Sequence, residues 1–164
     1  MQFDKLTARF QQALQQAHSL ALGKDNPYLE AGHVLKALLD DKNSGMGALL
    51  ANAGADLGRL QSNVAQSLAS LPRVSGQGGE LPPSRELQNV LNLMEKAAAK
   101  RGDAYIASEL FLLALMQEKG ATNQLLVSAG VSEAALNQAI DTMRGGQSVD
   151  NQNAEDQRDA LKKY

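Results

Sequence analysis

The feature that most constrains this chain is an internal duplication. Residues 26–39 read NPYLEAGHVLKALL and residues 103–116 read DAYIASELFLLALM, so a loop with a tyrosine leads into an apolar run in both stretches. The same offset of 77 residues relates Leu38 to Leu115, and the offset becomes 76 where Gly54 corresponds to Gly130. Two copies of one pattern in 164 residues predict a single domain with a pseudo-twofold core.

Each copy contains four segments in which apolar residues recur at spacings of three and four, which is typical of amphipathic helices. Aromatic residues make up only 4% of the chain, so the core must be built from aliphatic side chains, as in close-packed helices. The pattern therefore predicts an all-α fold. The expected helices are about 4–22, 31–41, 48–53 and 56–71 in the first copy, and 84–101, 108–118, 123–129 and 132–143 in the second.

The domain organisation follows from composition. Repeat one is expected over about 3–71 and repeat two over about 83–144, joined by a loop with a glycine-rich hinge at 76–79. Residues 1–145 would form the domain. Residues 146–164 begin as a polar linker and continue as a segment of helical propensity with few apolar positions, so we expect a connecting helix to a further module.

Several functions are disfavoured by composition. The formal charge of −2 and the absence of basic clusters argue against nucleic acid as a partner. The absence of cysteine, the presence of only two histidines and the lack of a nucleotide-binding motif argue against catalysis, a metal site or a cofactor in this chain. No apolar stretch is long enough for a membrane span, so we expect a cytoplasmic location, and nothing suggests a coiled-coil seam, so we expect a monomer.

Two acidic residues depart from the repeat. Asp103 and Glu109 stand where the first copy has Asn26 and Gly32, so the duplicated scaffold does not require them. One interpretation is local: Asp103 turns the chain and Glu109 favours the positive end of a helix. The other is that both acids, with Thr7, hydrogen-bond the backbone amides of an extended ligand beside an apolar groove. Residue patterns alone leave both interpretations open.

The chain resembles the Clp N-terminal domain family, and specifically the domain of ClpB-type AAA+ disaggregases. The resemblance rests on the opening FDKLT at 3–7, on YLE at 28–30 and YIASELF at 105–111, on RGD at 101–103, and on the tail MRGG at 143–146 with AEDQRDALKKY at 154–164. It covers essentially the whole chain.

The resemblance implies a mobile two-repeat module, linked to AAA+ modules that bind ATP and Mg²⁺ and assemble as a hexameric ring. It implies a stress-response chaperone domain that binds unfolded or aggregated polypeptide and is not itself an enzyme. The family's binding residues map onto Thr7, Asp103 and Glu109, and Leu91, Leu93 and Leu110 are candidates for an exposed apolar groove. The alternative function is docking of an adaptor, as in protease-linked Clp ATPases.

Overall fold

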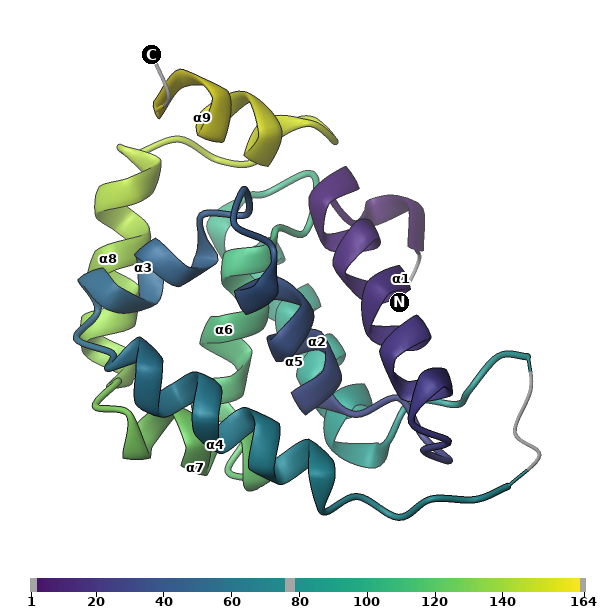
Figure 1. Ribbon diagram of the computed structural model, residues 1–164. Coiled ribbons are helices and arrows are strands. Elements are labelled where there is room, and N and C mark those ends of the chain that lie inside the picture. The colour runs from purple at the N-terminus through teal and green to yellow at the C-terminus, as the bar shows by residue number, and fades with distance from the viewer. Residues whose placement is uncertain (1–2, 76–78, 163–164) are drawn as a thin grey trace.

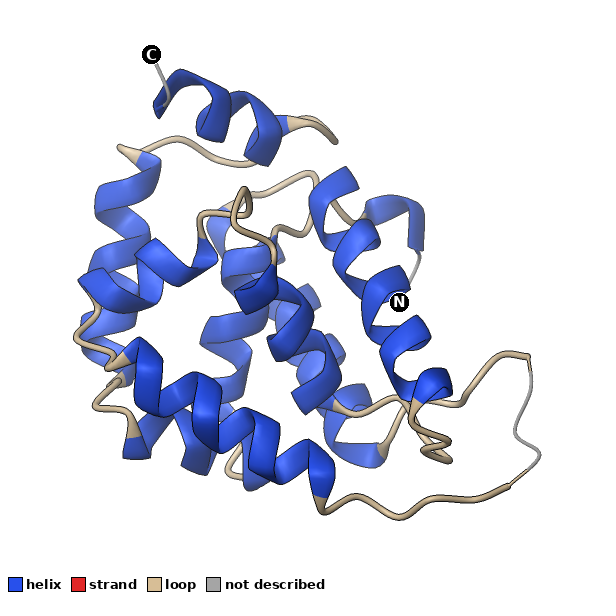
Figure 2. Cartoon of the chain, viewed as in Figure 1, coloured by secondary structure: helices blue, strands red, loops and turns tan. Residues whose placement is uncertain are grey.

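The computed structural model describes residues 3–75 and 79–162, and the part it describes is all-α (Figures 1 and 2). This confirms the predicted fold class. Residues 76–78 of the expected hinge lie outside the described residues. The helices are a 3-10 turn at Phe3–Lys5, α1 Ala8–Gly23, α2 Ala31–Asp40, α3 Met46–Asn52, α4 Leu57–Ala69, α5 Arg85–Arg101, α6 Ser108–Gln117, α7 Ala121–Ser128, α8 Glu133–Arg144 and α9 Ala154–Lys162.

Helix starts follow the capping residues. Asp56, Ser84 and Ser132 each accept a hydrogen bond from a backbone N–H in the first turn of α4, α5 and α8. The first helix differs from the prediction, since α1 begins at Ala8 and not near residue 4. Thr7 is its N-cap, because the backbone at residues 6 and 7 is extended and bonds to Ile106.

The pseudo-twofold relation is visible in the contacts between repeats. A bridge joins Leu6 to Ile106, and the bridge between Leu29 and Pro83 occupies the equivalent positions at the offset of 77. Likewise α3 packs against α8 while α4 packs against α7 (Figure 1). The two repeats are therefore built into one domain through reciprocal contacts.

The core lies along α2 and α6, the central helices of the two repeats. Every residue of α6 from Ser108 to Met116 is buried, although only part of it is apolar. The rings of Phe10 in α1 and Phe111 in α6 lie 5.6 Å apart between centroids and join the two repeats. Among the described residues no helix has both the length and the apolar content that a membrane span requires.

Candidate functional site

The two non-repeated acids are buried and held by arginines. Arg144, the last residue of α8, donates from Nη1 to Asp103 Oδ1 at 3.0 Å and from Nε to Glu109 Oε2 at 2.9 Å. Arg158, in α9, forms a fork with Nη1 and Nη2 each 3.1 Å from a Glu109 oxygen. Burial alone would raise the pKa of Glu109, but Arg158 and Arg144 together lower it, so this carboxylate stays charged.

A third carboxylate, that of Glu155, lies where two helices begin. Its Oε2 accepts from the Thr7 hydroxyl at the start of α1, and from Ser108 N at 2.9 Å and Ser108 Oγ at 3.1 Å at the start of α6. Helix N-termini favour negative charge at such a position. Burial and the charge of Glu109 nevertheless raise the pKa of Glu155 to about 7, against the hydrogen bonds from Thr7 and Ser108.

The backbone of the chain's C-terminal segment, defined here as residues 147–158, runs across the same surface. Ala104 N and Tyr105 N donate to Val149 O at 2.8 and 3.2 Å, and Val149 N donates to Asp103 Oδ1 at 3.0 Å. Ala8 N donates to Gln152 O at 2.9 Å. The predicted residues Thr7, Asp103 and Glu109 are therefore brought together, and each contacts the C-terminal segment or the arginine at the end of α8.

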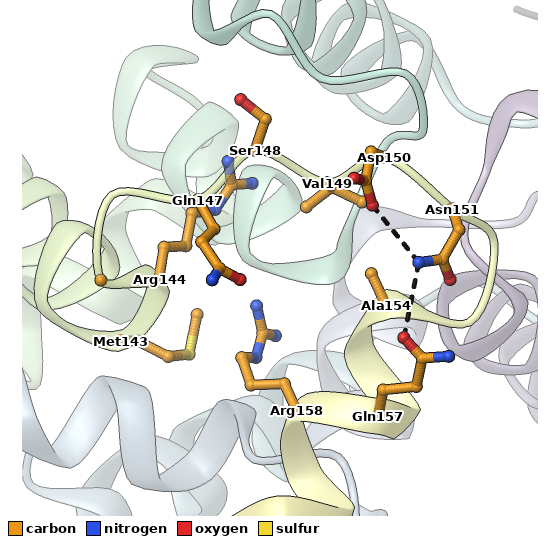
Figure 3. Close-up of a pocket in the computed structure, with 11 residues that line it drawn as sticks. Met143, Arg144, Gln147, Ser148, Val149, Asp150, Asn151, Ala154, Gln157 and Arg158 are labelled. Carbon is orange, nitrogen blue, oxygen red and sulfur yellow. Dashed lines mark hydrogen bonds between the residues drawn. The ribbon is translucent and has the colours of Figure 1, made fainter.

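A hollow of about 480 Å³ lies between the end of α8, the C-terminal segment and α9. Figure 3 shows Arg144 and Arg158 extending toward the same region from α8 and α9, with Val149 on the far side. In the loop between these helices, Asn151 donates to its neighbour Asp150 and to Gln157 of α9. This loop places α9 over the site.

Repeat one has no such cluster. At the position of Glu109 it has Gly32, and a Cβ there would lie 3.2 Å from Leu68, the residue that corresponds to Arg144. His33 is buried, with Nε2 2.9 Å from Asn26 Oδ1 and Nδ1 accepting from Glu30 N. Burial, with a smaller contribution from the charge of Lys24, lowers the pKa of His33 to about 4, so it is neutral at pH 7.

The three candidate leucines do not share one exposed groove, which corrects the sequence-based expectation. Leu110 is fully buried, because it faces the core from the first turn of α6. Leu91 and Leu93 are half-buried and line different hollows. Leu91 lies in a hollow of about 610 Å³ whose apolar lining is Phe3, Leu14, Leu29, Leu81, Pro83, Leu87 and Leu91.

The residues that sequence reasoning missed are Arg144, Arg158, Glu155, Ser108 and Val149. One signal could have revealed the first of them. At the offset of 76, an arginine replaces the apolar Leu68 on the inward face of a helix, and a buried cation requires an anionic partner. The substitution of Gly32 by Glu109 supplies that partner.

Comparison with known proteins gives the family. The model of the Clp repeat (R) N-terminal domain matches residues 5–129 of the chain. The chain is 48% identical over 160 residues, 98% of its length, to the "Chaperone protein ClpB" of Dichelobacter nodosus, and 44% identical over all 164 residues to that of Vibrio vulnificus. It spans only 19% of the length of these curated relatives.

Solved structures share the fold. The N-terminal domain of Hsp104 from Candida albicans superposes with a TM-score of 0.81 at 24% identity, covering 92% of this chain and 99% of that one. The N-domain of ClpV in complex with a VipB peptide gives a TM-score of 0.69 at 23% identity, covering 91% and 92%. The chain therefore belongs to the Clp repeat N-terminal domain family. Within that family, its curated relatives are ClpB chaperones.

Proposed function

We propose that this chain is the substrate-recognition domain of an ATP-dependent disaggregase chaperone and binds unfolded or aggregated polypeptide. ATP and Mg²⁺ would act in AAA+ modules of a longer, ring-forming parent and not in this domain. The ClpB relatives, of which the chain matches 19%, support this assignment.

The observation that carries the proposal is a surface that binds polypeptide backbone. The N–H groups of Ala104 and Tyr105 donate to the carbonyl of Val149, and the N–H of Ala8 donates to that of Gln152. Backbone carbonyls are present in every polypeptide, so such donors bind without regard to sequence. A domain that must accept many unfolded chains needs this type of contact.

An apolar hollow is connected to these donors through the N-terminal 3-10 turn. Phe3, half exposed in the N-terminal 3-10 turn, lines it together with Leu14 and Leu91. That turn is bonded to the backbone-binding loop, since Ile106 N donates to Lys5 O at 2.8 Å. Apolar side chains of an unfolded protein would bind here, and each contact would be weak. Several copies of the domain on one ring would raise the overall avidity.

The test is a titration of the 164-residue chain with reduced α-casein, a permanently unfolded polypeptide, followed by amide chemical shifts. We expect weak, fast-exchange shifts over residues 3–8 and 104–106 and around Leu91.

A matched pair of variants tests the hollow. Phe3→Ser and Val127→Ser each shorten an apolar side chain that is about half exposed, at 50% and 49%. Because burying part of a phenylalanine contributes about 1 kcal/mol, Phe3→Ser should weaken binding roughly fivefold. Val127→Ser should not weaken it.

Equal affinities of the two variants would refute the apolar part of the site, and the absence of any casein-induced shift would refute the function.

The second candidate function is docking of one folded adaptor. It is favoured by the fork between Arg158 and Glu109, since a bidentate ion pair selects particular side chains. A saturable interface with a single folded protein, without shifts from casein, would support this alternative.

A further inference from the structure

We propose that residues 147–158 are the resident ligand of the backbone-binding surface, and that an external polypeptide binds there by displacing them. The competition with external chains rests on the proposed function. The residence of the segment rests only on the contacts described above.

The segment is held as a ligand is held. Val149 is only 3% exposed, and its backbone bonds on both sides to the loop that precedes α6. Glu155, which is 0% exposed, accepts from the first N–H of α6 and from the hydroxyl that caps α1. Arg158 forms its fork to Glu109, and Asp156 forms an ion pair with Arg9 of α1 at 2.7 Å. Backbone, apolar and charged groups of one short stretch thus all find partners on the surface.

Comparison with repeat one shows which contacts of the segment belong to the repeated architecture and which are specific to repeat two. There the stretch after α4 also covers the loop before the central helix, with Asn26 Nδ2 donating to Pro72 O at 3.0 Å and Val74 N donating to Asp25 O at 2.8 Å. Covering this loop is therefore part of the repeated architecture. The charged contacts are not, because Gly32 stands in place of Glu109. The second repeat has added side chains that recognise its own C-terminal segment.

The burial of Glu155 makes the segment exchangeable. Three carboxylates (Asp103, Glu109 and Glu155) face two guanidinium groups (Arg144 and Arg158) in this cluster. Burying one uncompensated carboxylate opposes docking, because a charge loses its hydration on burial. When the segment leaves, Glu155 and Arg158 both return to water, while Arg144 stays with Asp103 and Glu109. The surface is then left with one excess negative charge and free backbone donors.

These contacts define the class of ligand. It is a stretch of polypeptide with a small apolar residue in a loop, where Val149 lies, followed by a helical turn with a hydrogen-bond acceptor where Glu155 lies. A cationic side chain three residues later would pair with Glu109. An external chain needs no carboxylate at the second position, because any carbonyl can accept from Ser108 N and Thr7 Oγ1.

The experiment compares the 164-residue chain with a released variant, Glu155→Ala/Asp156→Ala/Arg158→Ala, which removes the contacts of Glu155 with Thr7 and Ser108, of Asp156 with Arg9 and of Arg158 with Glu109. The control variant, Gln152→Ala/Gln157→Ala, shortens two exposed side chains of the same segment and keeps the carbonyl of residue 152. The probe is a labelled synthetic peptide of residues 147–158, added in trans and measured by fluorescence anisotropy. We expect it to bind the released variant at least tenfold more tightly than the native chain or the control, because a tethered ligand competes at high effective concentration.

Equal peptide affinity for all three chains, or no binding to the released variant, would overturn the inference. If the released variant does not fold, Arg158→Ala alone removes the half-buried contact and should give a smaller gain in the same direction. α-Casein is titrated in parallel. A casein affinity that is equal in the native and released chains overturns the competition and leaves the proposed function standing. Casein binding to neither chain overturns the proposed function, while the peptide titration still decides whether the segment is resident.

Discussion

The sharpest prediction concerns Arg144, which links the two buried acids. Its side chain is 5% exposed, and those of Asp103 and Glu109 are each 0% exposed. Arg144→Met keeps the apolar stem and removes only the guanidinium group. It leaves Asp103 without a cation, whereas Glu109 retains Arg158. The variant therefore adds a second uncompensated buried carboxylate to the cluster.

Removing one partner of a buried ion pair typically costs about 3–5 kcal/mol, and we expect about 3 kcal/mol because Glu109 is still compensated. The matched control is Arg101→Met. Arg101 donates to Asp141 and to the neutral Asn137, each at 3.0 Å, and the side chain of Asp141 is 68% exposed. An exposed pair contributes about 0–1 kcal/mol, so the control should lie within that range.

The assay is urea unfolding followed by circular dichroism at 222 nm, with the free energy of unfolding taken by linear extrapolation. The double variant Arg144→Met/Asp103→Asn removes the stranded charge together with its partner and should recover part of the loss. Losses of similar size in Arg144→Met and Arg101→Met would refute the argument that burial decides the contribution of these pairs. So would a double variant no more stable than Arg144→Met alone.

Two further predictions concern pH and have opposite signs. Docking of residues 147–158 should weaken as pH rises through about 7, because the pKa of Glu155 is raised from 4.5 to about 7 in the docked state. The docking constant should fall up to about tenfold per pH unit between roughly pH 5 and 7. The amide chemical shift of Val149 measures this constant. Glu155→Gln should flatten this profile, and an unchanged profile would contradict it. Global stability should instead fall on acidification, since the pKa of buried His33 is lowered from 6.5 to about 4; its contribution is present above pH 6.5 and lost toward pH 4. Urea midpoints of the native chain and His33→Gln should therefore converge as pH falls, and parallel curves would rule out this role.

Local signals in the sequence are sufficient to predict the positions of most helices. Capping residues such as Ser84 and Ser132 place helix starts correctly, because a side-chain acceptor in the first turn is a short-range property. The start of α1 was predicted about four residues too early, since Phe3 continues the apolar spacing although its side chain is 50% exposed. Pairing of the backbone at Leu6 with Ile106 keeps the helix from starting before Ala8, and no local pattern encodes a contact across 100 residues.

The candidate site was predicted only in part. Comparison of the two repeats singled out Asp103 and Glu109, and the structure brings them together with Thr7 around one segment; their role in binding a substrate stays a prediction. The partners Arg158 and Glu155 could not be predicted, because they lie in a polar stretch whose composition is that of a linker. Its docking depends on tertiary contacts. The domain boundary near residue 145 likewise stays a prediction.

The reciprocal bridges between the repeats also bear on the origin of the domain. Leu6 with Ile106 and Leu29 with Pro83 are the same contact made twice, with the roles of the two copies exchanged. A closed homodimer of one ancestral repeat would make such a pair of isologous contacts. In one fused chain the two halves are free to differ, because a position no longer has to fit its own copy. Glu109 and Arg144 are asymmetric substitutions of the kind that a symmetric homodimer cannot place in only one half.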